Sequence, residues 1–179
     1  MNMRESGTTP ADLRREFDRV FAQPLSGTPE TMVDLLILRI NGDRYALRLA
    51  EIDGLHADRA ITAIPSPVVG LLGVTGIRGR LVPVYSLPAL LGHDAAGATN
   101  RWLVLCRSPH PVALAFDHAE RYVRLPALHV HDADPSNVQV EHVRAVAHAD
   151  VVTYPIVAIP SVLARITKRC ELGHASKEQ

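Results

Sequence analysis

Residues 73–87 read Gly-Val-Thr-Gly-Ile-Arg-Gly-Arg-Leu-Val-Pro-Val-Tyr-Ser-Leu, which is two apolar runs separated by a basic turn that contains glycine. The runs predict two strands, Leu71–Ile77 and Leu81–Tyr85, on either side of Arg78-Gly79-Arg80. A loop that cradles a phosphate would need Gly-x-Gly-x-x-Gly and a helix directly after it, and the segment has neither. Its recurring glycines therefore favour a tight strand with close backbone packing.

Short strands are also predicted on both sides of this hairpin. Leu35–Ile40 and Tyr45–Leu49 flank Asn41-Gly42, a strong signal for a two-residue hairpin turn. Ser86 is a good N-cap and Pro88 suits a first turn, so residues 86–91 predict a short helix. The further strands are expected at Ala60–Ile64, Trp102–Cys106, Val112–Phe116, Arg121–Leu125, Val143–Ala147 and Val151–Ile159.

The order of strand and helix repeats along the chain. The strand and short helix that end near residue 91 have a counterpart in the strand and helix at residues 151–168, roughly 70 residues later. Many short strands with regular turn signals are typical of barrels. We therefore predict a mainly β fold made of a duplicated unit, with two small β-barrels that each end in a short helix.

Composition excludes several classes of protein. Of 179 residues, 47% are hydrophobic, so the chain can bury a core and is not disordered as a whole. Lys+Arg and Asp+Glu are both 19, and this balance argues against nucleic acid as a main partner. The apolar runs are far shorter than a membrane helix, so no insertion into the membrane is expected. Two cysteines make no disulfide framework, and a cytoplasmic location is expected.

The N-terminal region predicts a separate amphipathic helix. Within residues 11–22, Leu13, Phe17, Val20 and Phe21 have the spacing of one helix face, and residues 24–29 read as a linker. Two of the three phenylalanines of the chain lie on this face. The helix either docks on a partner through Phe17 and Phe21 or packs on its own domain.

The sequence contains no recognisable catalytic constellation, so no catalytic residue and no cofactor are expected. His129 and His131 alternate on an extended segment, which is more typical of a solvated turn than of a metal site, and no metal is expected. Cys106 lies in an apolar strand and is predicted to belong to the core, whereas Cys170 lies among charged residues.

Residues 73–87 resemble the signature of the CheW-like domain, the coupling module of bacterial chemotaxis, in which Arg-Gly is followed by Val-Pro and an apolar strand. The resemblance extends to the hairpin of residues 35–49, to residues 60–65 and 119–125, and to the end at residues 156–163. We therefore expect an N-terminal tail over residues 1–33, a CheW-like domain over 34–168 and a C-terminal tail over 169–179.

The resemblance implies two SH3-like five-stranded β-barrels around a hydrophobic seam. It also implies a protein without enzymatic activity. Such adaptors join the regulatory domain of a CheA-type histidine kinase to the cytoplasmic tips of chemoreceptors, so the chain is expected to be recruited to receptor arrays at the membrane.

Carried over residue by residue, the resemblance makes Arg78 an exposed contact for a partner. Gly73, Ile77 and Gly79 match its neighbours, and Ile52 and Leu55 match an apolar pair on the strand after the first hairpin. The chain departs from the family pattern where Gly54, Gly76 and Ser86 stand in place of the common Glu, Asn and Asp, and the prolines of its Pro65-Ser-Pro67 loop are one residue closer than usual. These departures leave open a scaffold in another pathway, such as one that controls pili, biofilm or polar arrays.

A sensor for a small ligand is the alternative from a different class of function. It would use the seam between the barrels as a pocket, with Asp117, His118, Glu120 and Arg121 as its polar groups. A nucleic-acid module is disfavoured by the neutral charge and the few aromatic residues.

Overall fold

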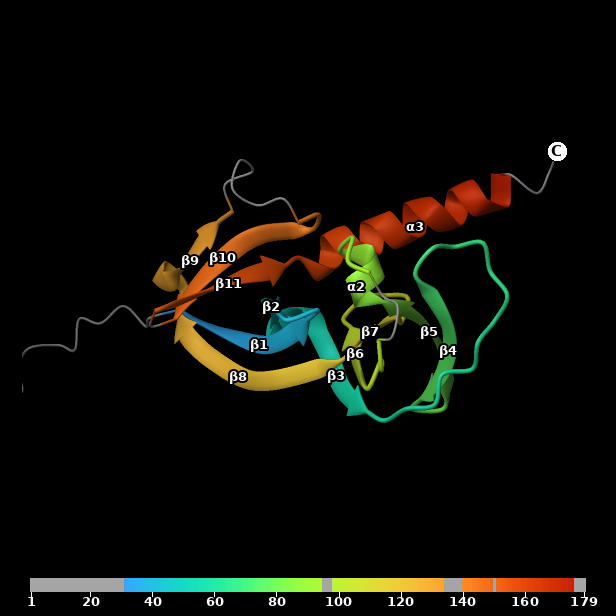
Figure 1. Cartoon of the computed structure of the whole chain (residues 1–179), viewed down its shortest axis with the longest axis horizontal. Helices are drawn as coiled ribbons and strands as arrows, with labels where there is room; N and C mark the ends of the chain where they lie inside the picture. The colour runs from blue at the N-terminus through green and yellow to red at the C-terminus, as the bar shows by residue number, and fades with distance from the viewer. Residues whose placement is uncertain (1–30, 95–97, 134–139, 150, 176–179) are drawn as a thin grey trace, which may run out of the picture. The chain divides into compact units, whose positions relative to one another are not determined.

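The computed structural model describes residues 31–94, 98–133, 140–149 and 151–175, with side chains up to residue 169 (Figure 1). The predicted N-terminal helix, with Phe17 and Phe21, lies outside the described residues, as does the side chain of Cys170. The described chain is mainly β. It forms two mainly antiparallel sheets and has few helices.

The first sheet has six strands in the order β8-β1-β2-β11-β10-β9, and the second has five in the order β3-β6-β7-β5-β4. The strands of the first sheet are β1 (Met32–Ile40), β2 (Asp43–Arg48), β8 (His118–Pro126), β9 (Val130–Asp132), β10 (Val143–Ala149) and β11 (Val152–Val157). Those of the second are β3 (Ile52–Ala57), β4 (Leu71–Ile77), β5 (Arg80–Ser86), β6 (Trp102–Cys106) and β7 (Ala113–Phe116). The helical segments are η1 (Leu49–Glu51), α2 (Leu87–Leu90), η2 (Ala127–His129) and α3 (Ile159–Ala175).

The two halves of the chain exchange hairpins. The β1–β2 hairpin pairs in parallel with β11 of the second half, with Ala46 opposite Ile156. The β6–β7 hairpin pairs in parallel with β5 of the first half, with Leu114 opposite Tyr85. Each sheet therefore contains strands from both halves of the chain. A parallel pair needs a long crossover, and here the crossover carries the chain from one sheet to the other.

Two hairpin turns follow directly from their residues. Asn41 and Gly42 have φ angles of 50° and 92°, and Arg78 and Gly79 have 50° and 74°. Positive φ at both central residues is the requirement of the two-residue type I′ turn, which matches the twist of the strands. Arg78 is an unusual residue for this conformation, because a side chain longer than that of Asn is rarely found there.

The strand predicted at residues 60–64 is wrong. Only Thr62 pairs, as an isolated bridge with Val74. This bridge brings the carbonyl oxygen of Thr62 to within 2.1 Å of the place where a Cβ on Gly73 would lie, and Gly73 has a φ of 148°. The segment therefore crosses β4 at a single point instead of running along it, and it is followed at once by Pro65, which cannot donate to a sheet.

Helix α2 begins as the sequence predicts, whereas α3 begins one residue earlier than predicted and is longer. The Ser86 hydroxyl accepts a hydrogen bond from the Ala89 backbone N–H and caps α2. Helix α3 starts at Ile159 and continues to Ala175, past the expected end at Lys168. Among the described residues, no helix is long and apolar enough to cross a membrane.

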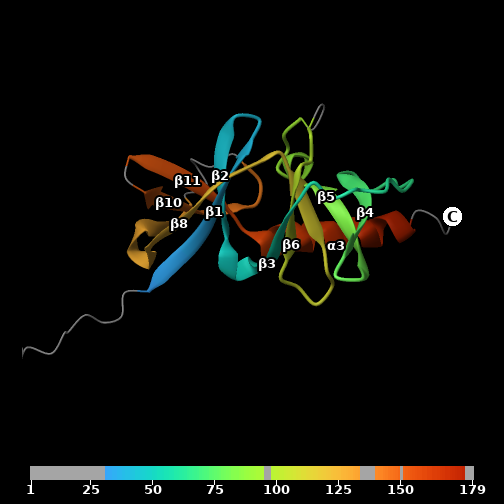
Figure 2. The same cartoon turned by 90° about the horizontal axis from the view of Figure 1, so that it is seen from below.

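The main hydrophobic cluster lies between the two sheets and joins them. It contains residues of β1 and β2 from the first sheet, of β5, β6 and β7 from the second, and of both α-helices. Figure 2 shows α3 running behind the second sheet, where Ile159, Val162 and Ile166 enter this cluster. Cys106 belongs to it, as predicted, and burial raises the pKa of its thiol to about 12.

Candidate functional site

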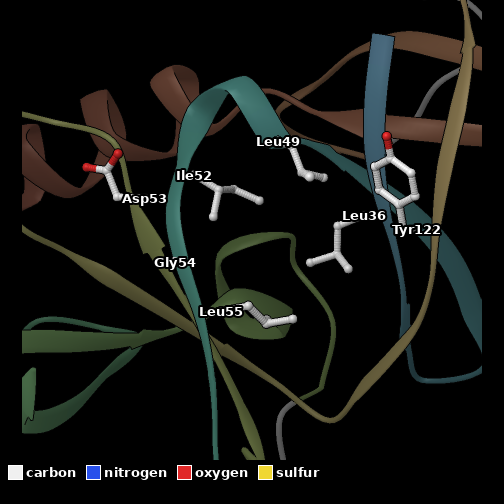
Figure 3. Close-up of a pocket in the computed structure, with 7 residues that line it drawn as sticks. All are labelled: Leu36, Leu49, Ile52, Asp53, Gly54, Leu55 and Tyr122. Carbon is white, nitrogen blue, oxygen red and sulfur yellow. The ribbon is translucent and has the colours of Figure 1, made fainter.

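An apolar groove of about 390 Å³ opens between the two sheets, next to η1 (Figure 3). Its walls come from β1, η1, β3 and β8. The lining residues are Leu36, Leu49, Ile52, Asp53, Gly54, Leu55 and Tyr122. Leu55 is 40% exposed and Tyr122 is 53% exposed, so large apolar surface faces solvent at the mouth of the groove. Exposed apolar surface that is gathered in a hollow is typical of a binding site.

Two of the predicted partner-binding residues, Ile52 and Leu55, line this groove. Sequence reasoning missed Leu36 and Tyr122, which come from β1 and β8, and β8 is far from β3 in the chain. The Tyr122 hydroxyl donates to Asp34 Oδ1, and this bond raises the pKa of the tyrosine. A lone aromatic residue among the charged positions of β8 was the signal that could have found it.

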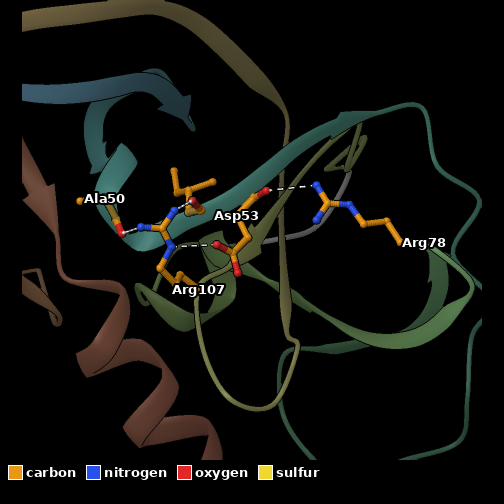
Figure 4. A network of polar contacts seen from close by, with 5 residues as sticks. Ala50, Asp53, Arg78 and Arg107 are labelled. Carbon is orange, nitrogen blue, oxygen red and sulfur yellow. Dashed lines mark hydrogen bonds and ion pairs between the residues drawn. The ribbon is translucent and has the colours of Figure 1, made fainter.

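Arg78 does not line the groove but contacts β3, one of its walls. Its Nη2 donates to the backbone carbonyl of Asp53 at 3.4 Å, and Asp53 is itself a residue of the groove (Figure 4). The guanidinium stays exposed, as the resemblance implies. The structure therefore links Arg78, through Asp53, to the strand that carries Ile52 and Leu55, although the sequence separates Arg78 from the other two by more than 20 residues.

The neighbours of Arg78 have different environments. Ile77 is buried in the core of the second sheet, and Gly73 is buried beneath Thr62. Gly79 is exposed and completes the turn. Backbone strain in a residue such as Arg78 is characteristic of functional positions, and here these neighbours supply the rigid hairpin that carries it.

Gly54, one of the departures from the family pattern, makes room for a histidine. A Cβ at Gly54 would lie 3.1 Å from His56 Nε2. Burial lowers the pKa of His56, and the nearby charges of Arg59 and Arg78 lower it further. Gly54 therefore lets the His56 ring lie close to the β3 backbone.

The four polar residues of the sensor alternative do not form one site. Asp117 Oδ1 accepts from the Asn100 backbone N–H at 3.0 Å. Glu120 pairs with Arg39 and Arg44, and these contacts lower the pKa of the Glu120 carboxyl. Arg121 donates to the Tyr154 hydroxyl, and His118 is exposed. Asp117, Glu120 and Arg121 are thus each engaged with a different partner within the fold.

The histidines predicted to lie in a solvated turn are on and beside β9, and both are exposed. The ring centroids of His131 and His148 are 5.4 Å apart. Within the described ranges, no group of three or more His, Cys, Asp and Glu side chains is placed to hold a metal ion.

The comparison with protein families agrees with this fold. Residues 34–167 match the CheW-like domain family. The chain belongs to this family. The CheW-like domain so defined contains every residue of the groove and also Arg78, so the site lies entirely within the matched part of the chain.

Among solved structures, the chain is similar to the scaffolding protein TtCheW from Thermoanaerobacter tengcongensis. The two share 17% sequence identity with a TM-score of 0.65, over 72% of this chain and 90% of that one. At this identity the likeness shows that the CheW-like fold is shared. A search of curated proteins found no match to the chain.

Proposed function

We propose that this chain is a non-enzymatic adaptor that couples a CheA-type histidine kinase to the cytoplasmic tips of chemoreceptors. The observation that carries the proposal is that Ile52 and Leu55 line one apolar groove and that Arg78 contacts the strand between them, at Asp53. The family resemblance assigns these three residues to partner contact, and Arg78 is separate in the sequence from the other two. Membership of the CheW-like family supports the same function.

The chemistry of the groove fits an amphipathic helix. Leu36, Leu49, Ile52 and Leu55 offer apolar surface to one face of such a helix, and the charged rim suits its polar flanks. We assign the groove to a helix of the receptor tip. The kinase regulatory domain then binds through a separate surface, because an adaptor must hold both partners at once.

The proposal includes the finer features that the resemblance implies. The two sheets correspond to two SH3-like barrels around the hydrophobic seam formed by the main cluster. The protein works in the cytoplasm and is recruited to receptor arrays at the membrane through the receptor tip. Phe17 and Phe21 belong to the proposed partner-binding set, as a second contact outside the CheW-like domain.

The test is a mixing experiment on a sizing column with the full chain. The chain is mixed with the regulatory domain of the kinase from the same genome, with a receptor-tip fragment, and with both. Wild type is expected to form a complex with each partner and a ternary complex with the two together. Arg78→Glu is expected to lose the receptor fragment and to keep the kinase domain.

Arg80→Glu is the matched control, because Arg80 is an exposed arginine two residues away in the same hairpin. It should behave as wild type. The adaptor function is refuted if wild type binds neither partner, and the assignment of Arg78 is refuted if both variants behave alike.

A further inference from the structure

Arg107 follows β6, outside the groove, yet it bonds to the four consecutive residues 50–53, of which Ile52 and Asp53 line the groove. Figure 4 shows its contacts with Ala50 and Asp53. Its Nε donates to Asp53 Oδ1 at 2.8 Å, its Nη1 to the Ala50 carbonyl at 2.9 Å and its Nη2 to the Ile52 carbonyl at 3.2 Å. Its backbone N–H donates to the Glu51 carbonyl at 2.9 Å. One residue therefore holds the whole of residues 50–53.

This pattern requires an arginine. A guanidinium presents several N–H donors in one rigid plane, whereas a lysine ammonium is a point charge on a flexible stem. The side chain of Arg107 is 60% exposed, so its ion pair with Asp53 alone would contribute little to stability. Arg107 matters because its guanidinium fixes the carbonyls of Ala50 and Ile52 together with the Asp53 carboxylate.

The wall needs such support because the β3–β6 pairing is irregular where it begins. The register shifts between Ile52 and Gly54, which leaves the start of β3 with a disturbed ladder. Asp53 lies at this shift. Its side chain is held by Arg107, and its carbonyl receives Arg78. The orientation that Arg107 imposes on Asp53 therefore also sets the place where Arg78 is held.

We propose that Arg107 is a positioning residue for docking, which keeps residues 50–53 and the Asp53–Arg78 contact in the conformation that the partner binds. It acts through these residues and does not itself touch the partner. The inference rests on the proposed function, since the groove is taken to be the docking site.

The first measurement is hydrogen exchange of the peptide covering residues 50–55 in the free full-length chain. In Arg107→Gln, exchange of this peptide is expected to rise several-fold, because the bonds that hold the wall are lost. Arg101→Gln is the matched control. Arg101 lies at the other end of β6, is also 60% exposed and makes a single ion pair, with Asp58 at 3.1 Å. Exchange of the same peptide should not change in this variant.

The second measurement is the Kd for the receptor-tip fragment. Arg107→Gln is expected to raise the Kd roughly tenfold, and Arg101→Gln is expected to leave it unchanged. Arg107→Lys keeps the charge but cannot bridge three acceptors, so it should recover only part of the affinity. Arg107→Lys also serves as the test variant if Arg107→Gln does not fold.

The outcomes separate the possible roles. Unchanged exchange in Arg107→Gln would refute the positioning role, and lost affinity with unchanged exchange would mean that Arg107 touches the partner directly. Faster exchange with unchanged affinity would show that the wall is held by Arg107 but that docking does not depend on it, which also overturns the proposal. Leu55→Asp is measured in parallel, because normal binding by that variant would refute the groove as the docking site and not the effect of Arg107 on the wall.

Discussion

The Glu51 carboxylate accepts a hydrogen bond from the backbone N–H of Ile159 at 2.9 Å, across 108 residues of sequence. Glu51 belongs to η1, next to the groove, and Ile159 is the first residue of α3. Ala158, directly before the helix, has no side chain that can cap it. Glu51 therefore supplies the missing cap from a distance and ties the groove wall to α3.

Replacing this cap is expected to cost stability. Glu51→Ala should lower the free energy of unfolding by about 1–2 kcal/mol, which is the usual cost of losing an N-cap acceptor. Glu51→Gln keeps an oxygen acceptor and should lose less. Urea unfolding followed by circular dichroism gives both values, and equal stability of Glu51→Ala and wild type would contradict the capping role.

Two glycines of β4 are expected to respond differently to alanine. At Gly73 a Cβ would lie 2.1 Å from the Thr62 carbonyl oxygen, whereas at Gly76 it would meet nothing within 4 Å. Gly73→Ala should lower the free energy of unfolding by about 3 kcal/mol or more, or prevent folding. Gly76→Ala should change it by no more than about 0.5 kcal/mol. Thermal unfolding of the two variants side by side tests this, and similar midpoints would show that the Thr62 crossing is wrong.

We expect that Arg78 lowers the stability of the fold and supports binding of the partner. Its φ of 50° suits Asn better than Arg, so Arg78→Asn should be as stable as wild type or more stable by up to about 1 kcal/mol. The same variant should bind the receptor-tip fragment less tightly, because it lacks the guanidinium. Arg80→Asn removes a charge from the same hairpin at a residue without positive φ, and it should show neither effect. A loss of stability in Arg78→Asn would mean that the arginine stabilises the turn.

Stability should fall in mild acid because of His142. Its ring is buried, Nδ1 is 2.9 Å from Ser161 Oγ, and burial followed by the charges of Arg144 and Arg169 lowers its pKa below 6.5. The unfolded chain therefore takes up a proton at a pH where the folded chain does not. Stability is full above about pH 6.5 and decreases as the pH falls toward the folded pKa.

The measurement is the free energy of unfolding from about pH 7.5 to about pH 5 in wild type and in His142→Gln. The variant should have a smaller slope over this range. His56, whose pKa is lowered in the same direction, should account for part of the slope that remains. An equal slope in the two proteins would show that His142 does not contribute.

The sequence predicted the parts of the fold that depend on neighbouring residues. The turns at Asn41-Gly42 and Arg78-Gly79 and the cap at Ser86 are local, and the structure contains all three. The exchange of hairpins between halves was not predictable in this way. It depends on parallel pairs such as Tyr85 with Leu114, and no local pattern encodes which strand becomes the partner.

The candidate site also combines residues that local patterns predict with residues that only the fold brings together. The resemblance supplied Ile52, Leu55 and Arg78, because they lie in or near short motifs. Tyr122 stands out in the sequence as the lone aromatic residue of β8, but no local pattern indicates that Tyr122 or Arg107 lies next to β3. Residues that act through long-range contacts become visible only when the topology brings their strands together.

The most direct test of the groove as the docking site compares two exposed apolar residues. Leu55 lines the groove, whereas Val69, which is 65% exposed, lies in the loop before β4. The Kd for the receptor-tip fragment is measured by titration for wild type, Leu55→Asp and Val69→Asp. A charge in the groove should raise the Kd more than tenfold in Leu55→Asp, with wild-type affinity retained in Val69→Asp. Equal affinities of the two variants would contradict docking in the groove.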